Sequence, residues 1–130
     1  MSAARPRLLL DTNVMLWFIL GDQRLGPDHR QLIERDAEAV IVSAASILEV
    51  STKVAIGKLR APRNLGPALV SVGFELLAVS SVHAEAVRDL PLLHRDPFDR
   101  LLVAQARFEG LTLLTSDRQL AAYDVDCQVI

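Results

Sequence analysis

Short continuous runs of apolar residues recur along the chain and predict the strands of a buried sheet. Four of these runs occupy residues 7–11, 39–43, 74–79 and 111–115, and a shorter run closes the chain at 127–130. None of them alternates cleanly between apolar and polar positions. Continuous apolar runs of this length are typical of parallel strands that are covered on both faces. The pattern therefore predicts a parallel sheet of four to five strands.

Helical signals fill the stretches between these runs. Pro27 and Pro97 stand where a first helical turn can begin, and Gly57 and Gly110 stand where a helix can end. Alternating strands and helices indicate a parallel α/β sandwich, and without repeats or linkers we expect one domain over residues 1–130. The predicted helices cover 12–20, 27–36, 44–57, 65–72, 82–90 and 97–109, with a short one after Asp117.

The composition narrows the class of protein. About half of the residues are hydrophobic (51%) and few are aromatic (5%), as in a globular, aliphatic domain. The single cysteine, Cys127, excludes an internal disulfide and fits a reducing cytoplasm. The apolar run at 8–20 is broken by polar residues and is too short to span a membrane, so we expect a cytoplasmic protein. The net charge is −2, but the acids discussed below account for the excess, so a polyanionic substrate is not excluded.

Two aspartates stand at the ends of predicted strands. Asp11 closes the first apolar run, and Asp117 comes just after the fourth. In open parallel sheets, ligands bind outside the carboxyl ends of the strands, where the strand order reverses. Both residues could therefore face one site. Capping of the following helix explains either of them alone equally well.

Glu49 has two structural explanations and one functional one. Ser46 and Glu49 have the spacing of a capping box, and Glu49 and Lys53 have the spacing of an ion pair on a helix. The helical neighbours of Glu49 are not those of a fully solvated side chain. The residues alone slightly favour a structural role.

Asp99 gives the strongest signal for a site. At 3.6 residues per turn it shares a stripe with Leu102, Val103 and Ala106, and a lone buried carboxylate is destabilising. Arg100 falls on the more polar side of this predicted helix.

Two residues just before Asp99 have structural interpretations. Asp96 precedes Pro97 and is best explained as a helix cap, with a supporting role at the site as the alternative. His94 is interpreted as a loop residue, because no second histidine has metal-ligand spacing to it.

Four acids set against core elements favour a metal site. A set of oxygen ligands selects hard cations, so we expect Mg²⁺ or Mn²⁺ and not zinc. Such a cation neutralises a phosphate, activates water and stabilises a leaving oxygen. The chain has no glycine-rich phosphate loop, no G-x-S-x-G motif and no convincing Cys–His pair.

Three ordered segments resemble a known family. They read LLLDTNVMLWFI (8–19), VSAASILEVSTKVAIGKL (42–59) and HRDPFDRLLVAQARFEGLTLLTSD (94–117). Together they are similar to PIN-domain ribonucleases, specifically the VapC toxins of type II toxin–antitoxin pairs. The resemblance implies a three-layer α/β/α sandwich and a metal-dependent endoribonuclease that hydrolyses RNA, often tRNA or rRNA. It also implies a homodimer and inhibition by a VapB-like antitoxin.

The resemblance also assigns residues. It places the catalytic, metal-binding acids at Asp11, Glu49, Asp99 and Asp117, and supporting residues at Thr12, Asn13, Asp96 and Thr115. Two positions depart from the family pattern. Toxins of this branch often carry an aromatic residue where Leu48 stands, and histidine or another small polar residue where Asn13 stands. Neither departure removes a carboxylate.

Basic residues near the acids could guide an RNA backbone. An alternative of equal weight is that they are simply solvated charges, favourable at a helix end. The candidates for RNA contacts are Lys53, Lys58, Arg95, Arg100 and Arg118.

Other functions were weighed against the nuclease. A non-catalytic binding module with the same fold, acting through a partner protein, is the principal alternative. A receiver domain requires a lysine at a late strand end, where Thr115-Ser116-Asp117 stands. A phosphatase of the haloacid dehalogenase kind requires a second aspartate where Asn13 stands, and the chain is too short for the clamps of a flap nuclease.

Overall fold

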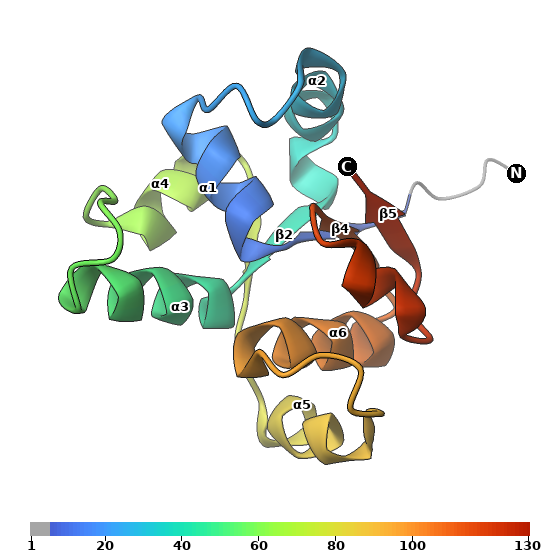
Figure 1. The fold of residues 1–130 in the computed structure, drawn as a ribbon. Helices are drawn as coiled ribbons and strands as arrows, with labels where there is room; N and C mark the ends of the chain where they lie inside the picture. Colours follow the sequence, from blue (N-terminus) through green and yellow to red (C-terminus); the bar gives the residue numbers. More distant parts are fainter. Residues whose placement is uncertain (1–5) are drawn as a thin grey trace, which may run out of the picture.

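A computed structural model describes residues 6–130 and shows a five-stranded, fully parallel sheet (Figure 1). The strand order is β3-β2-β1-β4-β5, so the predicted parallel sheet is confirmed. Each strand lies within its predicted run and is shorter at the ends. The strands are β1 (Leu8–Leu10), β2 (Val40–Ser43), β3 (Glu75–Leu77), β4 (Thr112–Thr115) and β5 (Cys127–Val129).

Six α-helices in the described residues connect the strands and cover the sheet. They are α1 (Thr12–Leu20), α2 (Pro27–Arg35), α3 (Ala44–Ala55), α4 (Leu65–Ser71), α5 (Ser81–Ala86) and α6 (Pro97–Glu109). Three short 3₁₀ helices complete the chain: η1 (Ala37–Ala39), η2 (Val87–Asp89) and η3 (Arg118–Ala122). No helix in residues 6–130 is long and apolar enough to cross a membrane.

Two apolar cores lie on opposite faces of the sheet and make three layers. Along β1, Leu8 and Leu10 pack with α1, α2 and α4, whereas Leu9 points to the other face and packs with α6. Figure 1 shows α1 and α2 on one side of the strands and α5 and α6 on the other. Helix α3 contributes Ala45 to one core and Val50 to the other. Burial on both faces explains why the strand sequences do not alternate.

The order of the strands fixes where a site can form. The chain builds β2 and β3 on one side of β1, then returns to place β4 and β5 on the other side. Strand order therefore reverses at β1, and its carboxyl end and that of β4 are adjacent. In open parallel sheets this reversal opens the crevice that binds ligands. Asp11 follows β1 there, and Asp117 lies just past β4.

Several predicted helix boundaries are confirmed and others are wrong. Asp96 caps α6 by accepting hydrogen bonds from the N–H groups of Phe98 and Asp99. Gly110 ends this helix in the left-handed conformation, with φ of 68°. The suggestion that Ser46 and Glu49 form a capping box is wrong, because α3 begins before Ser46 and has Ser43 as its cap. The predicted helix at 82–90 divides into α5 and η2, and the turn after Asp117 is the 3₁₀ helix η3.

Candidate active site and metal centre

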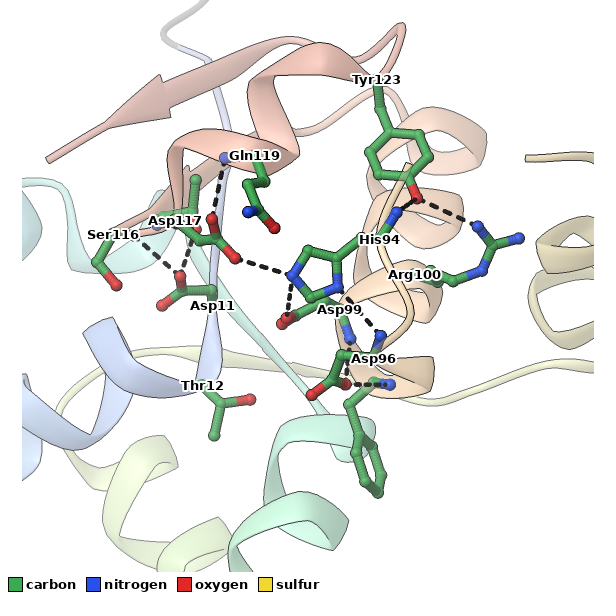
Figure 2. Close-up of polar contacts among 12 residues, drawn as sticks. Asp11, Thr12, His94, Asp96, Asp99, Arg100, Ser116, Asp117, Gln119 and Tyr123 are labelled. Atoms are coloured by element: carbon green, nitrogen blue, oxygen red, sulfur yellow. Dashed lines mark hydrogen bonds and ion pairs between the residues drawn. The ribbon is translucent and has the colours of Figure 1, made fainter. Parts of the chain in front are cut away.

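Asp11 is the most firmly held acid of the site. Its carboxylate is almost fully buried at the end of β1, where Oδ1 accepts a hydrogen bond from the Val14 N–H (2.7 Å) and so caps α1. Oδ2 accepts hydrogen bonds from the Thr115 hydroxyl and from the Ser116 N–H (3.0 Å) (Figure 2). Burial raises the pKa of Asp11; these hydrogen bonds oppose the rise, and the negative charge of Glu49 adds to it.

Thr115 joins Asp11 to the fourth acid. It is fully buried at the end of β4, and its hydroxyl oxygen donates to Asp11 while accepting from the Asp117 N–H (3.0 Å). Asp117 in turn accepts a hydrogen bond at Oδ1 from the Gln119 N–H (2.9 Å), which caps η3. The capping explanations for Asp11 and Asp117 are therefore correct. Capping engages Oδ1 in both residues, which leaves Oδ2 of Asp117 directed toward the other acids.

Glu49 enters the site from α3 and is only 5% exposed. The Thr12 hydroxyl donates to Oε1 (2.7 Å), and the Lys53 ammonium donates to Oε2 (2.7 Å). The predicted ion pair between Glu49 and Lys53 is therefore confirmed. The bond to Glu49 is the main cause of a raised Lys53 pKa, and the charges of Asp96 and Asp99 contribute. Lys53 therefore lies in the negative field of the pocket.

Asp99 differs from the other acids because it lacks a strong partner. It lies in the first turn of α6, above Leu102, Val103 and Ala106, which are buried as predicted. Its side chain is 21% exposed, and within residues 6–130 its carboxylate accepts no hydrogen bond; the ring nitrogen Nε2 of His94 lies 3.6 Å from its Oδ2. Burial, followed by the charges of nearby acids, raises the pKa of Asp99 to about 7.

His94 belongs to the site, contrary to its interpretation as an unrelated loop residue. Figure 2 shows its ring between Asp117 and Asp99, with Nε2 at 3.0 Å from Asp117 Oδ2. Each of these three side chains brings a potential ligand atom within 4.8 Å of the others. Histidine spacing gave no hint of this position. The sequence did contain a local signal for His94: it stands two residues before Asp96, the cap of the helix that carries Asp99.

Arg100 was predicted to lie on the more polar face of its helix, which is wrong, and its burial argues against the RNA contact for which it was a candidate. It is 7% exposed, and its guanidinium donates to the carbonyl oxygens of Val87, Leu90 and Pro91 and to the Tyr123 hydroxyl. A helical wheel does not show that η2 and the following residues fold over this side of α6. Arg100 therefore has a structural role.

The remaining candidate residues differ in how exposed they are. Asn13 is exposed in the first turn of α1. Lys58, Arg95 and Arg118 are also exposed, so their charges are accessible to a large ligand. Lys53 is half-exposed and is already paired with Glu49.

The donor set fits a hard divalent cation. Asp99 and Asp117 bring carboxylate oxygens within 4.8 Å of each other, and the charges of Asp11 and Glu49 act on Asp99 from nearby. Carboxylate oxygens are the ligands that Mg²⁺ and Mn²⁺ prefer. The Asp99 carboxylate is largely buried beside other acids and accepts no hydrogen bond within residues 6–130, and burial together with these acids raises its pKa. A cation beside Asp99 would supply compensating positive charge. Asp11, Glu49, Asp99 and Asp117 are the residues that could hold it.

Comparisons with known proteins agree with this geometry. Residues 8–126 match the PIN domain family. Ribonuclease VapC22 of Mycobacterium tuberculosis (strain ATCC 25618 / H37Rv) is 32% identical over 123 residues, which cover 89% of this chain and 91% of that protein.

Solved structures show the same fold. DNA-bound VapBC from Salmonella typhimurium has a TM-score of 0.70 at 15% identity, with 96% of this chain and 98% of that chain covered. VapBC2 from Rickettsia felis, bound to a fragment of its promoter, has a TM-score of 0.68 at 15% identity, with 94% and 97% covered. At such low identity the likeness concerns the fold alone. The family match and the sequence relative together show that the chain belongs to the PIN-domain family and is similar to the VapC ribonucleases.

Proposed function

We propose that residues 1–130 form one PIN domain that acts as a metal-dependent endoribonuclease, the toxin of a VapBC-type toxin–antitoxin pair. One observation carries the proposal: acids from four separate segments lie near the carboxyl ends of β1 and β4, and one of them, Asp99, accepts no hydrogen bond within residues 6–130. The similarity to a ribonuclease named VapC22 supports RNA as the substrate. Because the substrate is cellular RNA, we place the activity in the cytoplasm.

The proposed roles of the acids follow from how each is held. Asp11 is fixed by three hydrogen bonds and provides a rigid oxygen at the strand end. Thr12 orients Glu49 by a hydrogen bond, and the Thr115 hydroxyl fixes Asp11 and Asp117 relative to each other by bonding both residues. When bound, Mg²⁺ or Mn²⁺ would stabilise charge on the phosphate and lower the pKa of a water molecule. Hydrolysis by water would leave a 5′-phosphate and a 3′-hydroxyl.

Exposed basic residues provide candidate contacts for RNA. Lys58, Arg95 and Arg118 are exposed and unpaired within residues 6–130, so their charges can approach a phosphate backbone. Lys53 is a weaker candidate, because a phosphate would have to compete with Glu49 for its ammonium group. Arg100 has no place in this set.

Two protein partners are part of the proposal. The structural neighbours are VapBC complexes from Salmonella typhimurium and Rickettsia felis, which supports a VapB-like antitoxin as the partner of this chain. We also propose a homodimer, as the family resemblance implies. Size measurement of the isolated chain tests the dimer directly.

A non-catalytic binding module is the second candidate, and one observation favours it. Lys53 already pairs with Glu49 within the protein, and the His94 ring contacts Asp117, so two of the acids have partners without a metal ion. Such a module would keep the fold and act through a partner. It would not need to bind Mn²⁺.

Cleavage of total cellular RNA by the purified, antitoxin-free protein tests the proposal. Reactions with Mg²⁺ or Mn²⁺ are compared with reactions in excess EDTA, using the wild type, Asp99→Asn and Asp28→Asn. Asp28 is a matched control because it is also an acid in the first turn of a helix that begins with proline, but it is exposed. We expect metal-dependent cuts with the wild type and Asp28→Asn and none with Asp99→Asn.

Two outcomes would count against the nuclease. Full cleavage in excess chelator would exclude the metal scheme, and unchanged cleavage by Asp99→Asn would remove Asp99 from the site. If the folded protein cuts nothing, calorimetric titration with Mn²⁺ separates the candidates. Only the nuclease requires a working metal pocket.

A further inference from the structure

The ring of His94 is held in one orientation by a backbone group. The Asp96 N–H donates a hydrogen bond to His94 Nδ1 at 3.0 Å. A backbone amide can only donate, so Nδ1 must be the acceptor and must carry no hydrogen. In the neutral ring, the hydrogen therefore resides on Nε2.

This tautomer determines what Nε2 can do. Nε2 faces Asp117 Oδ2 at 3.0 Å and Asp99 Oδ2 at 3.6 Å. A ring nitrogen that carries hydrogen has no lone pair in the ring plane for a metal, so it acts as a hydrogen-bond donor. To become a ligand, His94 would have to move its hydrogen to Nδ1, where it would collide with the Asp96 N–H. The geometry therefore opposes ligation by His94.

The backbone of His94 is anchored as firmly as its ring. The Tyr123 hydroxyl accepts hydrogen bonds from the His94 N–H (3.0 Å) and from Arg100 Nη1 (3.1 Å). Arg100 also binds the carbonyl oxygens of Leu90 (3.2 Å) and Pro91 (2.8 Å), in the segment that leads to His94. Figure 2 shows Tyr123 and Arg100 to the right of the histidine ring, on the side away from Asp11. Both side chains are buried, so the anchor is shielded from water.

We infer that His94 is a positioning residue that orients Asp117 for the cation, and that it is not itself a ligand. The inference rests on the proposed function, because it assigns a role within the same metal site. Hydrogen-bonded partners of ligating carboxylates fix the direction of the ligand oxygens and raise metal affinity. His94 does this for Asp117 through a donor whose own position is set by Asp96 and Tyr123.

The alternative role makes a different prediction about the metal. If Nε2 were a ligand, the site would contain nitrogen and would favour metals such as zinc or nickel over Mg²⁺. As a donor, His94 leaves a set of oxygen ligands only. The two roles therefore differ in the tautomer of the ring when the metal is bound.

Nitrogen NMR of the histidine ring reads the tautomer directly. Protein labelled with ¹⁵N-histidine is recorded in mildly alkaline buffer, first metal-free and then with Mg²⁺, which is diamagnetic. The signals of His94 are assigned by their absence in His94→Gln. We expect hydrogen on Nε2 in both states. Hydrogen on Nδ1 in the metal-free protein, or loss of the Nε2 hydrogen when Mg²⁺ binds, would overturn the inference.

Two substitutions test separately the donor at Nε2 and the acceptor at Nδ1 of His94. His94→Gln can keep an N–H group at the position of Nε2, whereas His94→Asn can keep only an acceptor at the position of Nδ1. Loss of such a partner weakens metal binding by about 10–100-fold, so we expect that loss of Mn²⁺ affinity in His94→Asn and most of the affinity retained in His94→Gln. His29→Asn on α2 is the control and should bind as the wild type does.

The calorimetric results also distinguish this inference from the proposed function. Equal losses in His94→Gln and His94→Asn, in variants with unchanged melting temperature, would overturn the role of the donor while leaving the metal site in place. No Mn²⁺ binding by the wild type would overturn the metal site itself.

Discussion

Replacement of Asp99 by asparagine should stabilise the metal-free protein although it destroys the proposed site. The carboxylate of Asp99 is largely buried, accepts no hydrogen bond within residues 6–130 and lies among other acids. An amide of the same shape carries no charge and avoids both the desolvation and the repulsion. Few substitutions at a ligand are expected to raise stability, so the sign of the effect is informative.

The size of the stabilisation expected in Asp99→Asn follows from the pKa of Asp99. Burial and the neighbouring acids raise it from 3.8 to about 7, a difference worth about 4 kcal/mol of unfolding free energy at full strength. Part of the side chain faces solvent, which screens the charges and reduces the effect to about 1–2 kcal/mol. An acid in the first helical turn also gains about 0.3–1 kcal/mol from the helix dipole, and the variant loses this. The net gain should be about 1 kcal/mol.

The sign of the pH dependence is fixed by the same shift. Near pH 3 the carboxyl group is protonated in both the folded and the unfolded state, so the variant gains nothing. As the pH rises from 3.8 toward 7, the unfolded state releases its proton first, and the wild type loses stability relative to the variant. Above about pH 7 the difference is constant and largest.

Denaturant unfolding in EDTA measures this difference between Asp99→Asn and the wild type at several pH values. Asp28→Asn reports what an exposed acid in a first helical turn contributes, and it should be neutral or slightly destabilising. A variant less stable than the wild type at neutral pH would refute the reasoning. A difference in unfolding free energy between Asp99→Asn and the wild type that does not grow from acid to neutral pH would refute it too.

Three further results are expected from the same structure. Thr115→Val removes the hydroxyl that joins Asp11 to the Asp117 N–H and should lower the unfolding free energy by about 1–3 kcal/mol, whereas Thr112→Val on the same strand should change it little. Arg100→Met should lower the unfolding free energy by about 1–3 kcal/mol for each buried carbonyl group left without a donor, and an unchanged melting temperature would contradict the structural role of Arg100. Mn²⁺ at about 100 times its dissociation constant should stabilise the wild type by about 2.7 kcal/mol, and EDTA should reverse the shift; no shift would argue against the pocket.

The sequence predicted the sheet and most helices because their signals are local. Leu8, Leu9 and Leu10 are apolar whichever face they point to, and that continuity already requires layers on both sides. Asp99 could be recognised because the core-facing stripe of α6 continues through it. The same logic was wrong for Arg100, since a helical wheel cannot show which side a distant segment covers.

His94 shows the second limit of sequence reasoning. Its role depends on the meeting of Asp117, at the end of β4, with the loop before α6, and no spacing along the chain encodes that contact. The residues alone slightly favoured a structural role for Glu49, because its spacing to Lys53 predicts an ion pair. Only the buried contact with Thr12 shows that the ion pair faces the other acids.

The four acids differ in how the protein compensates their charge, and this difference suggests where a cation acts most strongly. Asp11 is compensated by hydrogen-bond donors, Glu49 by the Lys53 ammonium, and Asp117 by the cap of η3 and a histidine. Asp99 has none of these at hydrogen-bond distance. The largest electrostatic gain on binding a cation should therefore arise at Asp99, although Asp11 is the more rigid ligand. Rigid oxygens such as those of Asp11 define the geometry of the site, and the uncompensated carboxylate of Asp99 provides much of the attraction for the cation. The proposed function therefore depends most on the carboxylate whose charge the protein stabilises least.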